Sequence, residues 1–103
     1  MIKVSFLYAY RENGRFDIDY YCNTHMPMVA EKLGDALKGW SVDVGLAAGP
    51  APAFVAIGHT LFDSVDAFKA AIQPHGKLFA ADLPNYSDGD PPIVLISDRR
   101  AGT

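Results

Sequence analysis

The chain has 103 residues, 50% of them hydrophobic, and a formal net charge of −3. This length suits one domain with its own core, and the scattered basic residues argue against nucleic acid or an anionic membrane as a partner. Its apolar runs are too short to span a bilayer. A single cysteine, Cys22, and the lack of a signal-peptide pattern predict a reducing, cytoplasmic location.

The first half of the chain predicts a strand, a helix and a second strand. Residues 2–10 are rich in β-branched and aromatic side chains, which strands favour. Asp17 suits a helix N-cap, and the helix would run to about Leu33 and end at Gly34. Residues 37–47 predict the next strand.

The second half adds a strand, an interrupted helix and a final strand. A loop rich in glycine and proline precedes the strand predicted over 54–62, and the two neighbouring strands should form an antiparallel hairpin. Asp63 or Ser64 would cap a second helix, with a further helical turn over Leu78 to Leu83. The last strand is predicted over 93–97.

This order of elements predicts an α+β fold of the ferredoxin-like, split βαβ type, with a four-stranded antiparallel sheet and both helices on one face. The single domain would cover residues 1–98 and leave a disordered tail at 99–103. The strand at 54–62 carries large apolar side chains on both faces, so the face without helices should also be covered. A second copy packed sheet against sheet would supply that cover, and a monomer with an exposed apolar face is the alternative.

The segment Phe16–Pro27, FDIDYYCNTHMP, is an unusual start for a helix because it contains two tyrosines, a cysteine, a histidine and a proline. A helical wheel with about 100° per residue places His25 in the middle of the inward side and Tyr21 one turn before it, whereas Tyr20 points outward. Pro27 removes a backbone donor and would bend the helix there, which could open a gap between helix and sheet.

Two interpretations of His25 remain open at this point. It could be a core histidine bonded to a backbone carbonyl, or it could line a small apolar pocket together with the Tyr21 hydroxyl. Cys22 and His25 lie three positions apart, but two ligands do not make a metal site, and we expect none. Cys22 is better explained as a small buried hydrophobe than as a nucleophile. We also expect no cofactor, because no phosphate-binding glycine loop is present.

The first strand is followed by five motifs: Phe-Asp-x-Asp-Tyr-Tyr-x-x-x-His-x-Pro, Leu-Lys-Gly-Trp, Ala-Ile-Gly-His, Phe-Asp-Ser-x-x-Ala-Phe and Asp-Leu-Pro-Asn-Tyr-Ser. Together they resemble the EthD family, which is named for a protein needed in ethyl tert-butyl ether degradation. The resemblance covers Ile2 to Asp98, and its most specific parts are Tyr20–Pro27 and Asp82–Tyr86. It implies the dimeric α+β barrel, in which the sheets of two ferredoxin-like subunits pack together.

The resemblance implies less about chemistry than about fold. Relatives of the fold include cofactor-free monooxygenases, muconolactone isomerases, polyketide cyclases and haem-binding enzymes, and small members carry the label EthD family reductase. The motif histidine, His25, is implied to line a cavity. Further residues at similar positions are candidates for the ligand pocket, each with a structural role as the alternative: Trp40, His59, His75, Phe79 and Tyr86.

Two functions follow from these residues. In the first, an oxidoreductase or isomerase that needs no cofactor acts on a small apolar or aromatic molecule, with His25 transferring a proton and Tyr21 holding a carbonyl or enolate oxygen. In the second, the same homodimer and pocket only bind a ligand, as in a non-catalytic or stress-related protein. Haem bound through His75 is a further alternative that would give the protein a cofactor.

Overall fold

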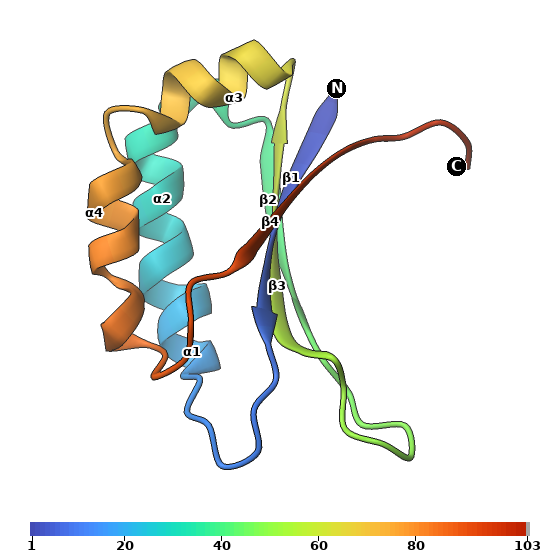
Figure 1. Ribbon diagram of the computed structural model, residues 1–103. Coiled ribbons are helices and arrows are strands. Elements are labelled where there is room, and N and C mark those ends of the chain that lie inside the picture. The colour runs from blue at the N-terminus through green and yellow to red at the C-terminus, as the bar shows by residue number, and fades with distance from the viewer. Residues whose placement is uncertain (103) are drawn as a thin grey trace.

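A computed structural model of the chain describes residues 1–102 and confirms the predicted α+β, ferredoxin-like fold (Figure 1). Thr103, at the end of the predicted tail, lies outside the described residues. The four strands form one antiparallel sheet in the order β2-β3-β1-β4. Their bounds are β1 Ile2–Ala9, β2 Gly39–Val44, β3 Phe54–Phe62 and β4 Ile93–Asp98.

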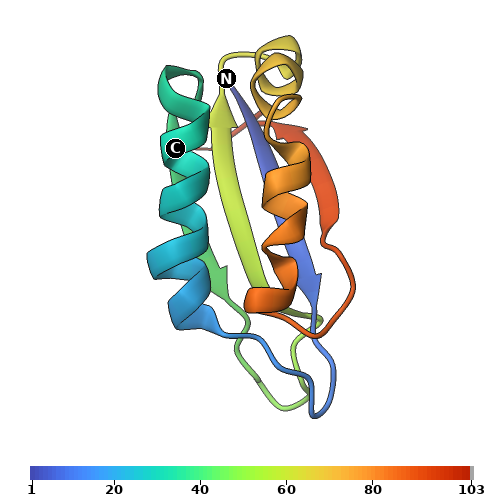
Figure 2. The same cartoon turned by 90° about the vertical axis from the view of Figure 1, so that its left-hand side faces the viewer.

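The helical segments all lie on one side of this sheet (Figures 1 and 2). In chain order they are α1 Ile18–Tyr20, the π-helical η1 Tyr21–His25, α2 Met26–Leu33, the 3-10 turn η2 Gly34–Ala36, α3 Val65–Ile72, α4 Gly76–Ala81 and the 3-10 turn η3 Leu83–Asn85. Seen from the helix side, α2 and α4 run side by side across the sheet (Figure 2).

Side-chain caps fix where the helical segments begin. The carboxylate of Asp17 accepts a hydrogen bond from the backbone N–H of Tyr20 at 3.0 Å, as the N-cap pattern predicted. The second cap is Ser64 and not Asp63, because the Ser64 hydroxyl accepts from the backbone N–H of Ala67 at 3.0 Å. These caps set Ile18 and Val65 as the first helical residues of the two segments.

Strand alternation gives the sheet two different faces. On the side of the helices, the even-numbered residues of β1 and β3 pair across the strands, with Val4 opposite Thr60 and Tyr8 opposite Ala56. These four residues are buried, at 5% exposure or less. Two hydrophobic clusters lie between this face and the helices, one around Val4, Val29, Leu33 and Phe62, the other around Tyr8, Tyr21, Met26 and Tyr86.

The odd-numbered face carries no helix. Its middle holds Ser5 directly opposite His59, flanked by Leu7 opposite Ile57. The loop of residues 45–53 between β2 and β3 and the segment after β4 both project away from the sheet on this side (Figure 1). The second strand ends at Val44, earlier than predicted, because the chain leaves the sheet to form that loop.

Among residues 1–102, no helix is both long enough and apolar enough to cross a membrane.

Candidate functional site

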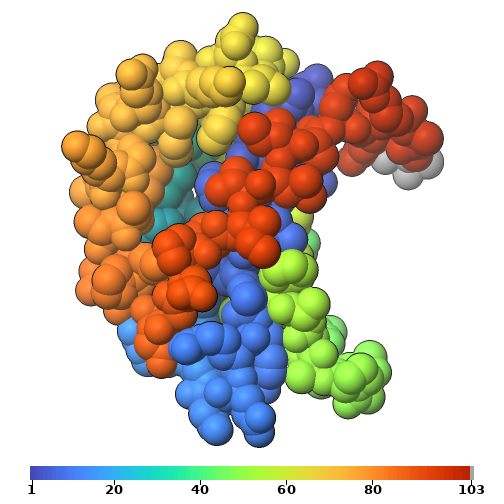
Figure 3. Space-filling model, viewed as in Figure 1, coloured from blue at the N-terminus to red at the C-terminus, as the bar shows by residue number. Residues whose placement is uncertain are grey.

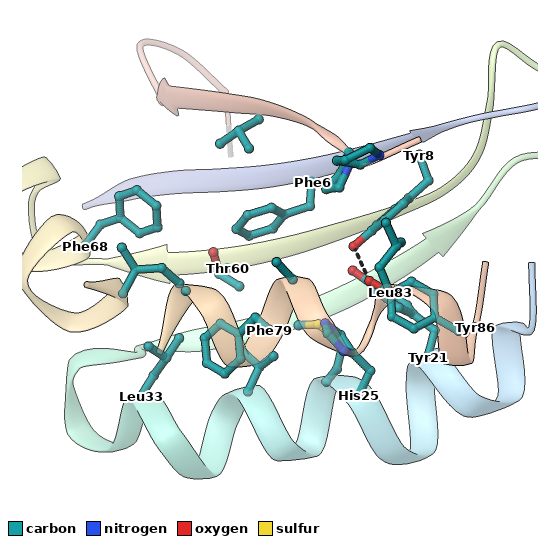
Figure 4. Close-up of a pocket in the computed structure, with 18 of the residues that line it drawn as sticks. Phe6, Tyr8, Tyr21, His25, Leu33, Thr60, Phe68, Phe79, Leu83 and Tyr86 are labelled. Carbon is teal, nitrogen blue, oxygen red and sulfur yellow. Dashed lines mark hydrogen bonds between the residues drawn. The ribbon is translucent and has the colours of Figure 1, made fainter. Parts of the chain in front are cut away.

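A cavity of about 300 Å³ lies between the sheet and the helices (Figure 4). It reaches the surface at a hollow between α4 and the segment that leads into β4 (Figure 3). Most of its wall is apolar and comes from both layers of the fold: Phe6, Met26, Val29, Leu33, Phe62, Phe68, Ile72, Phe79, Ala80, Leu83 and Val94. Mostly apolar walls with a few polar groups are typical of small-molecule sites.

The helix that supplies His25 is widened just before Pro27. The backbone N–H of Met26 donates to the carbonyl of Tyr21, which is one residue farther back than in an α-helix. Pro27 itself lacks the N–H that an unbroken helix would use next. The wide turn stacks the rings of Tyr21 and His25 at a centroid distance of 5.2 Å and an angle of 14°.

This π-helical turn corrects the helical wheel. The extra residue rotates the helix, and Met26, which directly follows the wide turn, is buried at 2% exposure. It also brings Tyr20, predicted to point outward, toward α4, where its hydroxyl donates to Asp82 at 2.8 Å. The predicted inward direction of His25 and Tyr21 is unaffected, and both are buried at 5% and 1% exposure.

A carboxylate holds one side of the His25 ring. Nδ1 of His25 lies 2.8 Å from Oδ2 of Asp82, and a carboxylate can only accept, so Nδ1 carries the proton. The other oxygen of Asp82 accepts from the Tyr20 hydroxyl and from the side-chain amide of Asn85, both at 2.8 Å. Three donors therefore fix the carboxylate that orients His25.

The surroundings shift the pKa values of both partners. Burial lowers the pKa of His25 below its ordinary value of 6.5, and the hydrogen bond and charge of Asp82 oppose that effect only in part. Desolvation pushes the pKa of Asp82 upward, but hydrogen bonds from Asn85, His25 and Tyr20 outweigh it and hold the pKa below its usual 3.8. At neutral pH the pair is therefore a neutral imidazole bonded to an ionised carboxylate.

The second nitrogen of His25 faces the cavity. Each buried side-chain nitrogen or oxygen within residues 1–102 has a hydrogen-bond partner. Nε2 of His25 has no such partner in that part of the chain, so it must be open to the cavity that His25 lines. With the proton on Nδ1, Nε2 presents a lone pair that can accept a proton.

Three buried tyrosines close the same end of the cavity. The hydroxyls of Tyr8 and Tyr86 are 2.8 Å apart, and the rings of Tyr8, Tyr21 and Tyr86 lie within 5.1 to 5.8 Å of one another (Figure 4). Burial raises the pKa of all three hydroxyls, so they stay protonated and can donate hydrogen bonds. Tyr86 also packs against His25, with a centroid distance of 4.8 Å.

Gly58 lets Tyr21 approach the sheet. A Cβ atom at position 58 would lie 2.2 Å from the Tyr21 hydroxyl, which is far inside contact distance. A glycine in the middle of a strand weakens it, and close approach of another group is a common reason to keep one there. The tyrosine end of the cavity therefore depends on a missing side chain in β3.

Comparison with solved structures identifies the relatives of this chain. An EthD-like protein from Ralstonia eutropha JMP134 is 44% identical, with a TM-score of 0.87 over 94% of this chain and 89% of the other. This chain belongs to the EthD family. The membership confirms the resemblance predicted from the five motifs. No protein-family model matches the chain, and neither does any curated protein.

Two more distant structures share the fold of this EthD-family chain. An ethyl tert-butyl ether degradation family protein from Bacillus halodurans C-125 is 21% identical, with a TM-score of 0.73 over 97% of this chain and 99% of the other. An antibiotic biosynthesis monooxygenase is 13% identical, with a TM-score of 0.57 over 98% of this chain and 100% of the other. At these identities the likeness concerns the fold alone.

The structure brings four of the predicted site residues of the EthD-family chain together. Tyr21, His25, Phe79 and Tyr86 all line the cavity, from two helices and the turn that follows α4. Their placement agrees with the predicted pocket, while their roles in binding or catalysis remain predictions.

The other three predicted pocket residues do not line this cavity. Trp40 lies on the edge strand β2 and is 41% exposed. His59 projects from the opposite face of the sheet, where its ring is bonded to Ser5 and Asp43. His75 directly precedes α4 and stacks on the Phe79 ring at 5.9 Å. Trp40 is kept away by its place on an edge strand, and His59 by its odd-numbered position on the other face of the sheet. The motifs specify neither.

Sequence reasoning missed Asp82, Tyr8 and Gly58. Asp82 opens the Asp-Leu-Pro-Asn-Tyr motif that marks the EthD family, but its bond to His25 spans 57 residues. Tyr8 shares the even-numbered face of the first strand with Val4, and this alternation could have predicted that Tyr8 is buried on the same side. Nothing local to Gly58 shows which side chain approaches it. Among residues 1–102, no three His, Cys, Asp or Glu side chains gather as metal ligands.

Proposed function

We propose that this EthD-family protein binds a small, largely apolar or aromatic molecule in the cavity and that His25 transfers a proton to or from it. One observation carries the proposal: Asp82 fixes the tautomer of a neutral, buried His25 whose Nε2 is open to an apolar cavity. A base whose pKa is lowered from 6.5 is neutral at physiological pH and is therefore ready to accept a proton. The reaction would be an oxidation of the monooxygenase type or an isomerisation.

The chemistry needs two kinds of group, and both are at the same end of the cavity. Nε2 of His25 would accept a proton from an acidic C–H or O–H group of the substrate. The Tyr8–Tyr86 hydroxyl pair, 2.8 Å apart, would donate to the oxygen on which negative charge develops. In an isomerisation, His25 would return the proton to a different carbon of the substrate. In an oxidation, molecular oxygen as a second substrate would accept the electrons of the deprotonated molecule, leave one oxygen atom in the product and release the other as water. No metal or cofactor is part of the proposal.

A role restricted to ligand binding is the second candidate. The bonded tyrosine hydroxyls can hold a ligand oxygen whether or not a reaction follows, because their raised pKa values keep them protonated. The two candidates differ only in what His25 does. A variant at this position can therefore separate them.

The experiment compares His25→Gln with His59→Gln, a histidine on the other face of the sheet. Wild type and both variants would be screened by thermal shift and turnover against phenols, quinones and lactones. We expect His25→Gln to lose roughly 100-fold or more in turnover while His59→Gln keeps it. Turnover that survives in His25→Gln would rule out the proton-transfer role. Binding without turnover in all three proteins would favour the binding role.

We further propose that the protein is a homodimer joined through the odd-numbered face of the sheet. Leu7, Ile57 and Leu95 lie on that face, and Leu95 is 51% exposed. The loop of residues 45–53 contains only Gly, Leu, Ala and Pro, and its Leu46 is 82% exposed. An apolar face flanked by an apolar loop that projects from the same side is self-complementary, as a twofold interface requires.

Leu95→Asp and Leu78→Asp form a matched pair for the dimer proposal. Both leucines are about half exposed in one chain, at 51% and 46%, but Leu78 is on α4, away from the proposed interface. Sedimentation of wild type at low micromolar concentration should give twice the 11.2 kDa chain mass. We expect Leu95→Asp to sediment as a folded monomer and Leu78→Asp as a dimer. A monomeric wild type would overturn the proposal.

A further inference from the structure

The cavity is polar at one end and apolar at the other. Figure 4 shows Tyr8, Tyr21 and Tyr86 grouped at one end, whereas Leu33 and Phe68 lie at the opposite end. The two hydrophobic clusters of the fold divide in the same way, since the tyrosines belong to one and Leu33 to the other. A ligand that fills the cavity must therefore have one polar end and one apolar end.

No cation is available for an anionic ligand. The cavity wall, which consists of described residues, includes no lysine or arginine. His25 is the basic group on the wall, and burial keeps it neutral near pH 7. Behind it lies the ionised Asp82, 2.8 Å from Nδ1. A carboxylate placed here would lose its hydration and gain no opposite charge, which is costly.

The three tyrosines leave one donor for a neutral oxygen. The Tyr8 and Tyr86 hydroxyls share one hydrogen bond of 2.8 Å, in which either one donates, and the Tyr8 hydroxyl is also hydrogen-bonded to that of Tyr21. Three hydroxyls that share two hydrogen bonds keep one hydrogen that is free to bond to another oxygen. A phenol, enol or ketone oxygen matches one such donor, and a phenol or enol can also donate to Nε2 of His25.

We propose that the ligand is a neutral molecule with a single phenol, enol or ketone head and an alkyl or aryl tail, and that free carboxylates are rejected. The head would lie between the tyrosine hydroxyls and His25, and the tail would extend toward Leu33 and Phe68. This inference rests on the proposed function of the cavity. It narrows the substrate class to exclude acids and acid-bearing lactones.

Three probe molecules that share a butylphenyl group and differ in the head test this selectivity: para-butylphenol, para-butylbenzoate and butylbenzene. Their binding to wild type would be measured by calorimetry near neutral pH. We expect the phenol to bind roughly 10-fold or more tightly than the benzoate, because of the missing cation. Benzoate binding as tight as phenol binding would overturn the inference while leaving the cavity as a binding site. If none of the three molecules binds, both the proposed function and this inference about the ligand fail.

Two variants locate the ends of the ligand. Tyr86→Phe keeps the ring and removes one hydroxyl, so phenol affinity should fall about 2- to 13-fold while butylbenzene affinity stays the same. Ile72→Trp fills space at the apolar end and should weaken para-hexylphenol more than para-ethylphenol. Equal losses for phenol and butylbenzene in Tyr86→Phe, or equal losses for both tail lengths in Ile72→Trp, would overturn the proposed orientation.

Discussion

Each face of the sheet is associated with a histidine hydrogen-bonded to a carboxylate, and the two pairs differ in what the rest of the ring does. On the helix side, His25 binds Asp82 through Nδ1 and keeps Nε2 open to the cavity, with side-chain exposures of 6% and 14%. On the other face, His59 binds Ser5 through Nδ1 and Asp43 through Nε2. The Asp43 side chain there is 70% exposed.

The comparison shows why similar contacts support different roles. Both nitrogens of His59 are occupied, so its ring links strands β1, β3 and β2 and has no atom left for a ligand. His25 has one nitrogen fixed and one free, and burial lowers its pKa. An oriented ring with a free lone pair is what a general base requires, whereas a fully bonded ring stabilises structure.

The largest effect is expected from Asp82→Asn, which changes the hydrogen bond between His25 and Asp82. An asparagine amide would donate to Nδ1 of His25, which moves the ring proton to Nε2 and removes the free lone pair. We expect turnover to fall roughly 100-fold or more, together with some loss of stability, because the folded chain favours the ionised carboxylate. Nitrogen-15 spectra of the imidazole ring would report the tautomer directly. Asp43→Asn is the control and should leave both turnover and the His25 tautomer unchanged.

The next largest effect is expected from Gly58→Ala, which pushes on the tyrosine end of the cavity. The added Cβ meets the Tyr21 hydroxyl, and overpacking of this kind typically costs about 1–3 kcal/mol in the free energy of unfolding. Gly39→Ala on β2 is the control, because its Cβ would meet only the flexible end of Leu61 at 3.3 Å. Equal denaturation midpoints for both variants would mean that a Cβ atom at position 58 does not disturb Tyr21.

The pH dependence of stability should single out His25. Since its pKa is lower in the folded chain than the ordinary 6.5, the unfolded chain binds the proton first as the pH falls. The stability linked to this group is therefore complete above about pH 6.5 and is lost as the pH drops through the folded pKa. Asp82, whose pKa is lowered from 3.8, contributes a separate loss only in more acidic solution.

Urea denaturation at several pH values between 7 and 5 checks this expectation. His25→Gln should flatten the curve in that range, and His59→Gln should keep the slope that His25 causes. A slope that persists unchanged in His25→Gln would assign the titration to another group.

The smallest effect is expected from Asp43→Asn on the open face. Exposed ion pairs and hydrogen bonds contribute about 0–1 kcal/mol, and Asp43 is largely exposed in the single chain. If a second copy covers this face, Asp43 becomes buried and the cost should grow as the dimer forms. Denaturation of the variant at two protein concentrations, with wild type alongside, would show whether the loss depends on concentration.

The sequence predicted much of the fold because its signals are local. Alternating apolar residues placed the strands, Asp17 marked a helix start, and 3.6-residue periodicity turned Tyr21 and His25 inward. The same local reasoning failed at Tyr20, because the π-helical turn that follows adds one residue to a single turn and rotates the helix. A wheel assumes a constant angle, so it cannot anticipate a local change of pitch.

The sequence by itself determined the order of the elements, the buried direction of His25 and the family to which the chain belongs. Only the tertiary structure decided which histidine has a free nitrogen. Asp82 reaches His25 across 57 residues and Ser5 reaches His59 across 54, and both contacts exist because packed helices or paired strands bring distant residues within 2.8 Å. Strand pairing and helix packing are long-range properties, and they separate two similar residues into a candidate base and a link between strands.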